Sequence, residues 1–529
     1  MELPRLIEAL SSPAAYPHAV DAVEVRQTHI SVVFLAGPYA YKIKKPVAFD
    51  FLDFSTLEKR RQACEAEVRL NRRLAPDVYR DVVPISVTGS SLAIERPGEI
   101  AEWAVKMGRL PEGATLKARL LDGALTTQHL EAVARRIADF HAGAEAGSHV
   151  ARFGRFEIVA QNARENFTQA RPAVGVAVSL PVFRRLLFLT EEALDRLRPV
   201  IEARAERGVP RDTHGDLRLD HVYLLPDRPP PGDVVIIDCI EFNERFRFAD
   251  PIADVAFLVM DLKFHGRADL ARSFVDVYCR AAGDDEGRVL LPFYTAYRAV
   301  VRAKVEGFEL SEHEIPETDR QAARRGAQAH WLLALEELET PSRRPCLILV
   351  AGLPGAGKST LAKGLAELAG FKWIRSDVVR KELAGLPSNE PARADFEEGI
   401  YGSAWTDRTY AECLHRAERR LLDGERVIVD ASFVEEQRRR PFLELAERLA
   451  IPARFMVCRA NPDVIRDRLE QRRGDASDAD WDVYERAAGR WEELGPMARR
   501  VLASIDADGT PSQVLEQAMK VLRDASLLD

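Results

Sequence analysis

The chain has 529 residues, of which 46% are hydrophobic and 30% are charged, and its formal net charge at pH 7 is −8. At about 100–200 residues per domain, this length predicts roughly two to four domains. The acidic balance argues against a dedicated nucleic-acid binder and against a protein of anionic membrane surfaces.

The six cysteines are scattered and form no CxxC pair, so we expect neither a zinc cluster nor a disulfide framework. Scattered, unpaired cysteines are typical of proteins in a reducing, cytoplasmic environment. The first residues, MELPRLIEALSSPAAYPH, mix charged and apolar positions and do not resemble a signal peptide. No apolar run is long enough to span a bilayer, and no membrane partner is expected.

In chain order, residues 22–44 predict three extended strands, DAVEVRQ, SVVFLAG and YAYKIKK. Residues 57–75 predict a helix, because their apolar positions recur at helical spacing. Long helical patterns follow at 125–205 and 252–335. Between them lie two short strands, HVYLLP and DVVIID, which the DRPPPG loop joins. This order predicts an α+β domain, with a small sheet and one helix followed by a mostly helical lobe.

The clearest break in the pattern lies near LEELETPSRRP, where a charged helix ends in a proline-flanked basic stretch. We place a domain boundary at about residue 340, which divides the chain into 1–340 and 341–529. After residue 345 apolar strands alternate with helices, a pattern typical of a parallel α/β sheet.

The second predicted domain opens on the apolar strand CLILVAG, followed by GLPGAGKST and a helical pattern. Its glycines let backbone N–H groups close around phosphate oxygens, and the helix N-terminus favours negative charge. Lys358 would reach the β and γ phosphates of ATP, and Ser359 would ligate Mg²⁺. The candidate nucleotide-binding residues are Gly352, Leu353, Pro354, Gly355, Ala356, Gly357, Lys358, Ser359 and Thr360.

Two aspartates follow later strands of this domain. Asp377, in FKWIRSDVVRKEL, would accept the proton of a substrate hydroxyl, or it would only cap the helix that follows. Asp430, in GERVIVDASF, would hold the magnesium shell, or it would be a turn aspartate. Ligands sit beyond the carboxyl ends of such strands, which favours the functional interpretation of both residues.

A cluster of arginines follows in DVIRDRLEQRRGDASDAD. Arg468, Arg472 and Arg473 surround a helix end with a polar loop after it. As a lid they would neutralise charge on the transferring phosphoryl group, with Arg468 and Arg472 as the candidate catalytic residues. A solvated charged helix face is the alternative.

Taken together, residues of about 345–515 resemble the small P-loop kinases: zeta toxins, polynucleotide 5′-kinases, gluconate kinases and chloramphenicol phosphotransferases. The resemblance implies phosphoryl transfer from ATP to a hydroxyl group, with Asp377 as the base. It also implies that Arg380 lies on the acceptor side. These motifs specify the kinase superfamily well and the acceptor poorly.

An HGDLRLDHVYL motif followed by VVIIDCIEF lies in the first predicted domain. These motifs resemble the aminoglycoside phosphotransferase and choline kinase group, across about residues 20–335. The resemblance implies a protein-kinase-like fold. ARRIADFHAG, DPIADVAFL and EWAVKMGRLP also resemble segments of that group.

The resemblance also implies a role for individual residues. Asp216 matches the catalytic aspartate, which would accept the proton of the acceptor hydroxyl. Asp238 matches the magnesium-binding aspartate. Lys42 matches the strand lysine that contacts the nucleotide phosphates, with Glu67 placed on a helix to hold it. Lys44 shares the face of Lys42 and is the fallback for this lysine.

Two features depart from the group's pattern. The loop RQTHIS between the first strands has no glycine, so Thr28 and Ser31 hydroxyls or the backbone would have to cover the nucleotide. His221 stands where a metal-binding asparagine is expected, although Mg²⁺ prefers oxygen ligands. Three roles stay open: His221 binds a softer metal, Asp220 supplies the oxygen instead, or His221 is a hydrogen-bonded histidine without a metal.

For the whole chain, the sequence predicts an ATP- and Mg²⁺-dependent bifunctional kinase that acts on small hydroxylated molecules. One alternative is a degenerate N-terminal kinase fold that binds a ligand and controls the C-terminal kinase. The acceptor of the C-terminal kinase would then be a nucleotide sugar or a nucleic-acid 5′-hydroxyl. The acidic balance makes nucleic acid the less expected partner. The sequence leaves the oligomeric state open.

Overall fold

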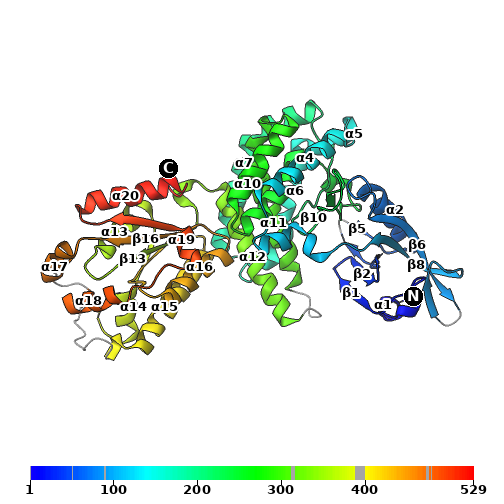
Figure 1. Cartoon of the computed structure of the whole chain (residues 1–529). Helices are drawn as coiled ribbons and strands as arrows, with labels where there is room; N and C mark the ends of the chain where they lie inside the picture. Colours follow the sequence, from blue (N-terminus) through cyan, green and yellow to red (C-terminus); the bar gives the residue numbers. More distant parts are fainter. Residues whose placement is uncertain are drawn as a thin grey trace. The chain divides into compact units, whose positions relative to one another are not determined.

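The computed structural model describes residues 2–49, 52–88, 91–310, 316–387, 399–471, 476–477 and 479–529 (Figure 1). The chain divides into two compact units. Unit 1 comprises 1–162, 196–263 and 267–295, and unit 2 comprises 163–195, 264–266 and 296–529. The helices that precede residue 340 therefore lie with the C-terminal segment, and the predicted domain boundary at that residue stays a prediction.

Unit 1 contains a six-stranded antiparallel sheet in the order β1-β2-β3-β8-β6-β7. Its strands are β1 (Val23–Gln27), β2 (Ser31–Ala36), β3 (Tyr39–Lys44), β6 (Tyr79–Thr88), β7 (Ser91–Ile94) and β8 (Glu99–Gly108). Helix α1 (Leu3–Leu10) packs on one face of this sheet and α2 (Leu57–Asn71) packs on the other. Side chains alternate between the faces of a strand, so Lys42 and Lys44 of β3 both point to the α2 face.

The rest of unit 1 is mostly helical and carries the short hairpin of β10 (Val222–Leu224) and β11 (Val234–Ile236). Helix α9 (Pro251–Phe264) is buried on nearly all sides, and its sequence PIADVAFLVMDLKF is apolar around most of its circumference. The other elements of this part, some of which continue into unit 2, are β4 (Ala48–Phe49), β5 (Leu52–Asp53), α3 (Leu116–Leu121), α4 (Thr127–Gly143), α5 (Ser148–Ala151), α6 (Phe156–Ala170), α7 (Leu180–Glu206), β9 (Arg211–Asp212), α8 (Glu244–Arg247), β12 (Phe248–Ala249), α10 (Ala268–Ala282) and α11 (Leu291–Glu309).

Unit 2 contains the predicted parallel sheet, with five strands in the order β14-β15-β13-β16-β17. They are β13 (Leu347–Ala351), β14 (Lys372–Arg375), β15 (Val427–Asp430), β16 (Ala453–Arg459) and β17 (Leu502–Asp506). Figure 1 shows α13 (Lys358–Ala369) and α20 (Pro511–Asp524) along one side of the sheet, and α15 (Ser403–Leu422) and α16 (Glu436–Arg448) along the other. Every residue of β13 is buried, as expected for a strand covered on both faces.

The strand order reverses at β13, because β15 lies on one side of it and β16 on the other. In open α/β sheets, ligands bind beyond the carboxyl ends of the strands at such a point. The remaining helices of unit 2 are α12 (Glu317–Leu338), α14 (Ser376–Leu383), α17 (Pro462–Gln471), α18 (Trp481–Gly489) and α19 (Pro496–Arg500). Among the described residues, no helix combines the length and the hydropathy that crossing a membrane would require.

Candidate active sites

The loop between β13 and α13 has the backbone that its glycines predict. Gly352 has φ +141°, and a Cβ placed on it would lie 2.5 Å from the carbonyl oxygen of Cys458 in β16. Gly355 has φ +78°, and its Cβ would lie 2.8 Å from Ile465 of α17. Gly357 is the N-cap of α13, with φ +86°. The loop is therefore tightly enclosed, and a side chain at Gly352 or Gly355 would displace its neighbours.

Lys358 and Asp430 lie together at the carboxyl edge of this sheet. The Lys358 ammonium donates a hydrogen bond to the Leu353 carbonyl within the loop, at 2.9 Å. Asp430, the last residue of β15, is 2% exposed. Burial raises the pKa of Asp430, whereas the Lys358 charge and a hydrogen bond from Ser359 oppose that rise. The two predicted metal ligands, Ser359 and Asp430, are thus neighbours in the folded chain.

One oxygen of Asp430 is suited to a cation. Its Oδ2 atom is buried and accepts no hydrogen bond from any residue that the structure describes. The Arg375 Nε atom lies 3.9 Å from it. A buried carboxylate oxygen without a hydrogen bond is costly unless a ligand completes its contacts. Together with the Ser359 hydroxyl, it forms the hard oxygen donor set that Mg²⁺ prefers.

Asp377 lies in the first turn of α14, directly after β14. Arg375 is the N-cap residue, and no side chain forms a capping hydrogen bond at this helix end. Asp377 therefore does not serve as the cap that sequence analysis left open. Its carboxylate is close enough to Asp430 to add to the rise of the pKa of Asp430, after burial. Across the described ranges, no hydrogen bond to the Asp377 side chain is found.

Arg468 of α17 lies beside the same loop. Its Nη1 atom is 3.7 Å from the position of a Cβ on Gly357, and its Nη2 atom donates to the Ala507 carbonyl at 2.8 Å. Nη1 is buried, and none of the described residues accepts a hydrogen bond from it. The predicted catalytic residue Arg472 and its neighbour Arg473 lie outside the described residues.

Arg380, expected on the acceptor side, is 7% exposed. It donates to the Ile400 carbonyl at 2.8 Å and to the Thr406 hydroxyl at 3.0 Å. Its guanidinium also lies over the Tyr401 ring, 5.3 Å from the ring centre. These contacts give Arg380 a structural task, tying α14 to the start of α15.

The candidate site of unit 1 gathers residues from distant parts of the chain. Lys42 Nζ lies 2.9 Å from Glu67 Oε1 and 2.6 Å from Asp238 Oδ1. The predicted contact between the strand lysine and the helix glutamate is therefore present, and Asp238 is a second partner of this lysine. Burial raises the pKa of Asp238, but the Lys42 charge and then His221 outweigh it, so the net pKa is well below the ordinary range. Asp238 is thus ionised in this arrangement, as a metal ligand must be.

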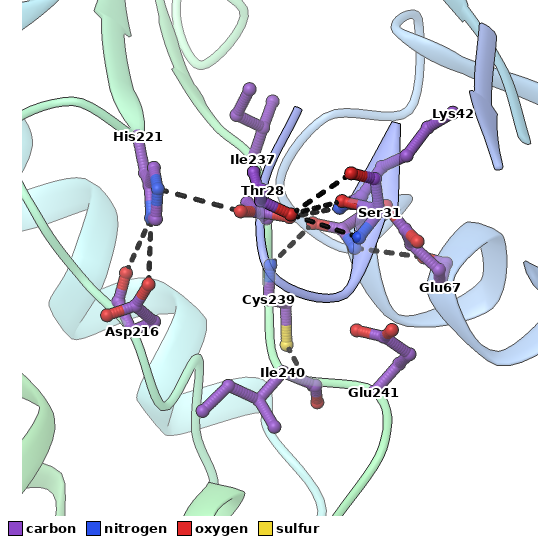
Figure 2. Close-up of polar contacts among 12 residues, drawn as sticks. Thr28, Ser31, Lys42, Glu67, Asp216, His221, Ile237, Cys239, Ile240 and Glu241 are labelled. Carbon is purple, nitrogen blue, oxygen red and sulfur yellow. Dashed lines mark hydrogen bonds and ion pairs between the residues drawn. The ribbon is translucent and has the colours of Figure 1, made fainter. Parts of the chain in front are cut away.

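Lys44 is also part of this charge cluster. Its ammonium lies 2.5 Å from Glu67 Oε2 and forms a second ion pair with Glu241. The Lys44 side chain is fully buried, and Glu241 is 4% exposed. Glu241, drawn in Figure 2, is the functional neighbour that sequence analysis missed. Its only signal was a carboxylate three positions after Asp238 in an otherwise apolar stretch, IDCIEF.

His221 reaches both aspartates of the site, and Figure 2 shows its links to Asp216. Its Nδ1 atom donates to the Asp216 carbonyl oxygen at 2.8 Å, and its Nε2 atom accepts from Arg218 at 3.2 Å. The same Nε2 atom lies 3.6 Å from Asp238 Oδ2. Asp220, the other candidate for the asparagine's role, instead pairs with Lys117 at 3.1 Å.

The arrangement around His221 has a chemical consequence. Both ring nitrogens already have protein partners, so the structure holds His221 as a hydrogen-bonded histidine. Carboxylate oxygens of Asp216 and Asp238 each lie 3.6 Å from a nitrogen of this ring, and Mg²⁺ binds imidazole poorly. Among the described residues, no group of three or more His, Cys, Asp or Glu side chains is placed to hold a metal ion. The metal role of His221 stays a prediction.

Asp254 of α9 holds the loop that carries Asp216. Its two carboxylate oxygens accept hydrogen bonds from the backbone N–H groups of His214, at 3.0 Å, and Gly215, at 2.8 Å. His141 of α4 lies 3.1 Å from the same carboxylate, and its other nitrogen lies 2.8 Å from the Tyr278 hydroxyl. The sequence pointed to the DPIADVAFL and ARRIADFHAG segments but assigned these residues no role, because each segment holds more than one charged or titratable residue.

The turn between β1 and β2 is closed by its own side chains. The Thr28 and Ser31 hydroxyls lie 2.8 Å apart, and the Ser31 N–H donates to Thr28 Oγ1 at 3.0 Å (Figure 2). The Thr28 N–H donates to the Ser31 carbonyl at 2.9 Å. Ile30, at the tip, packs against the apolar cluster of Leu52 and Phe54. These hydroxyls thus stabilise the turn itself.

Two family models match parts of the chain. They cover Glu67, Asp216 and Asp238 of the unit 1 site and the glycine loop of unit 2, whereas Lys42 and Lys44 lie outside both matches. The model of the phosphotransferase enzyme family matches residues 51–292, and that of an AAA domain matches residues 347–494. The fold and the sites therefore define the class: a protein-kinase-like phosphotransferase domain followed by a P-loop domain of the kinase type.

A protein of Mycobacterium tuberculosis (strain ATCC 25618 / H37Rv), described as uncharacterised, is 35% identical over 509 residues. The alignment covers 95% of this chain and 96% of that protein. The chain therefore belongs to the same family as this mycobacterial protein.

Two solved structures resemble 35% of the chain. A sugar kinase from Janibacter sp. HTCC2649 has a TM-score of 0.27 at 20% identity, with 98% of that chain covered. A gluconokinase from Sinorhizobium meliloti 1021 has a TM-score of 0.26 at 20% identity, with 95% of that chain covered.

Proposed function

We propose that the protein is an ATP-dependent phosphotransferase with two separate active sites, each of which transfers the γ-phosphoryl group of ATP to a hydroxyl acceptor. The convergence of Lys358, Asp430 and Asp377 at the carboxyl edge of the unit 2 sheet carries this proposal. The three groups supply the positive charge, the metal ligand and the base that phosphoryl transfer requires.

In unit 2, Ser359 and Asp430 would hold Mg²⁺, which neutralises phosphate charge when it is bound. Lys358 exchanges the Leu353 carbonyl for phosphate oxygens, an exchange that costs little because a carbonyl is a neutral partner. The Asp377 carboxylate accepts the acceptor's hydroxyl proton as the acceptor oxygen bonds to the γ-phosphorus and ADP leaves. The buried Nη1 donor of Arg468 faces the loop and favours the charge of the transferring group.

In unit 1, Lys42 would turn from Asp238 and Glu67 to the nucleotide phosphates. Asp238 would then be available to a metal ion, and Asp216 would accept the proton of the acceptor hydroxyl. Arg218 Nε lies 3.4 Å from Asp216 Oδ2, which keeps that carboxylate oriented.

A matched pair of variants tests the two-site proposal in the intact protein. ATP and Mg²⁺ are supplied with a pooled library of sugars, nucleosides and other hydroxylated compounds, and products are detected by the mass shift of one phosphate. We expect Asp377→Asn and Asp216→Asn each to slow a different product by about 10²–10⁴-fold, because each substitution removes one general base. Lys358→Ala should remove the same product as Asp377→Asn.

Different results of this assay would contradict the proposal. If both aspartate variants keep every product of the wild-type protein, neither carboxylate is a base. If all transfer depends on Asp377 and none on Asp216, unit 1 is not a kinase under these conditions.

That last result would favour a second candidate function, in which unit 1 is a degenerate kinase fold that binds a ligand and controls unit 2. The turn closed by Thr28 and Ser31 favours this candidate, because its hydroxyls are already engaged. The protein partners on both nitrogens of His221 favour it as well. Titration of the intact Lys358→Ala variant with a fluorescent ATP analogue separates the two candidates, since only the first requires a remaining nucleotide site.

We propose a small molecule as the acceptor for unit 2, in a cytoplasmic setting. The net charge of −8 supports this, because nucleic-acid binding relies on basic surface. Labelled phosphate transferred to a 5′-hydroxyl oligonucleotide would contradict this assignment.

A further inference from the structure

Two lysines on one face of β3 share a single carboxylate. Lys42 Nζ lies 2.9 Å from Oε1 of Glu67, and Lys44 Nζ lies 2.5 Å from Oε2. Each lysine also has a second partner of its own: Asp238 for Lys42 and Glu241 for Lys44. The cluster therefore has two ends, joined by Glu67.

The two ends differ in exposure. The Lys44 and Glu67 side chains are fully buried, and Glu241 is 4% exposed. Lys42 is 12% exposed and Asp238 is 42% exposed. The Phe54 ring lies over the Lys44 ammonium, 5.5 Å from the ring centre, and belongs to the apolar cluster that closes this end. Only the end that carries Lys42 and Asp238 opens to solvent.

This difference decides which lysine can change partners. If Lys44 left, Glu67 would keep Lys42, but Glu241 would stay buried without a cation, which is strongly unfavourable in a low-dielectric interior. If Lys42 left, Asp238 would be solvated, because its side chain is partly exposed, and Glu67 would keep its ion pair with Lys44. The exchange is therefore feasible at Lys42 and not at Lys44.

We propose that the work of the strand lysine is divided between two residues. Lys42 is the lysine that turns to the nucleotide phosphates. Lys44 is a positioning residue that keeps its ion pairs with Glu67 and Glu241 throughout. Lys44 holds Glu67 and Glu241, and through them it holds α2 and the segment after Asp238 against β3. This inference rests on the proposed nucleotide site of unit 1.

Charge balance gives Lys44 its specific role. Lys42 and Lys44 together balance Glu67 and Glu241. Once Lys42 turns to phosphate, Lys44 is the cation that remains between the two buried carboxylates. Without it, the departure of Lys42 would leave Glu67 unpaired and would release α2. Lys44 therefore lets Lys42 leave without moving the helix.

The first test identifies the lysine that reaches the nucleotide. The intact protein is treated with an acyl-phosphate derivative of ATP, which acylates amines beside bound phosphates, and labelled peptides are mapped by mass spectrometry. We expect ATP-protected labelling of Lys42 in the wild-type protein, and no labelling of Lys44 either there or in Lys42→Met. Labelling that moves to Lys44 in Lys42→Met would overturn the inference and make Lys44 a true substitute.

The same map distinguishes this inference from the proposed function. If Lys358 is labelled and neither Lys42 nor Lys44 is, then unit 1 has no nucleotide site, and the proposed function of unit 1 falls together with the inference. If Lys44 alone is labelled, the proposed site stands and the division of work is wrong.

The second test uses the variant Lys44→Met/Glu241→Gln, which removes one buried cation and one buried anion together. The matched control is Lys59→Met/Asp53→Asn, an ion pair of 2.5 Å whose side chains are 44% and 50% exposed. Affinity is read as the concentration of a non-hydrolysable ATP analogue that halves labelling at Lys42. We expect a rise of about tenfold or more in the double variant and no change in the control.

Amide exchange in α2 separates positioning from a general structural role. In the double variant Glu67 has only Lys42 as a cation, and Lys42 turns away when nucleotide binds. Saturating nucleotide should therefore speed amide exchange across residues 57–71 in the variant and should not do so in the wild-type protein. Faster exchange in the variant that does not depend on nucleotide would show a merely structural role and overturn the inference.

Discussion

At the scale of single residues, the imidazole of His221 lies between the two aspartates of the unit 1 site. It replaces a hard oxygen donor with a nitrogen that already accepts a hydrogen bond from Arg218. Asp377 differs in that its carboxylate forms no cap on α14, and its role as the base stays a prediction. The two sites therefore differ in how closely single side chains match the proposed chemistry.

We expect His221→Asn to strengthen Mg²⁺-dependent nucleotide binding in unit 1 by about tenfold, because an amide oxygen suits Mg²⁺ better than an imidazole nitrogen. Calorimetric titration of the Lys358→Ala background with an ATP analogue, with and without Mg²⁺, measures this change. The variant His129→Asn, at an exposed helix end, is the control and should change nothing. Weaker binding in His221→Asn would instead show that the histidine itself supports the nucleotide.

His214 predicts a dependence of stability on pH. Burial lowers the pKa of His214 from 6.5 to about 4, although Asp254 opposes this fall. Between these values the unfolded chain binds the proton and the folded chain does not, so stability is complete above pH 6.5 and falls as the pH drops. From pH 7 to pH 5 this single group should cost the folded state about 2 kcal/mol.

Urea unfolding of the wild-type protein and of His214→Gln at both pH values measures this cost. The wild-type protein should lose more stability than the variant, by about 2 kcal/mol. An equal loss in both proteins would show that His214 does not titrate in this range.

At the scale of elements, each site depends on a junction between a strand and a helix. In unit 2 the junction is local, since β13 leads directly into the glycine loop and α13. In unit 1 the junction joins segments that are distant in the sequence. The strand β3 and the helix α2 meet through Glu67, and the segment after β11 contacts β3 through Asp238 and Glu241. A local junction is readable as a motif, whereas a distant one depends on how the elements pack.

Substitution of Lys44 tests the distant junction by its effect on stability. Lys44→Met leaves Glu67 and Glu241 with one fewer cation, and breaking such a buried pair costs about 3–5 kcal/mol. Lys59→Met, in the exposed first turn of α2, should cost about 1 kcal/mol or less. Chemical unfolding followed by circular dichroism compares the two variants. Similar costs for both would mean that the buried cluster contributes little to the fold.

Sequence patterns predicted most of the elements that carry the sites. The apolar and β-branched runs SVVFLAG and YAYKIKK predicted the strands β2 and β3, and GLPGAGKST predicted the loop before α13, because both signals are local. The pairing of Lys44 with Glu241 could not be predicted, since 197 positions separate them in the sequence. The contacts of Arg380 could not be predicted either, because its partners at Ile400 and Thr406 follow from the approach of α15 to α14. Its place on the acceptor side stays a prediction.

At the scale of the whole molecule, the chain joins two different kinase-like folds. Unit 1 has an antiparallel sheet and a loop with Asp216 held by a buried helix, and unit 2 has a parallel sheet with a glycine loop. If both bind nucleotide, both should be stabilised by it, since a ligand that binds only the folded state adds to stability.

A saturating Mg²⁺–ATP analogue, at one hundred times its dissociation constant, should stabilise each unit by about 2.7 kcal/mol. Amide exchange resolves the units, because protection in β13 reports unit 2 and protection in β3 reports unit 1. Removal of Mg²⁺ with EDTA should abolish most of the effect in unit 2, where Asp430 and Ser359 are the proposed ligands. Lys358→Ala should abolish protection in unit 2 and leave unit 1 unchanged; protection lost in both would contradict two independent sites.

The sequence by itself determined the two fold classes, the order of the two kinase-like regions, and the residues at each strand end. It could do so because strand alternation, helical spacing and glycine-rich turns act between residues that are close in the chain. Only the tertiary structure decided which polar groups meet: Lys44 with Glu241, His221 with Arg218, and Asp254 with the backbone of the loop that carries Asp216. Such contacts depend on burial and on the meeting of distant segments, which no local pattern records.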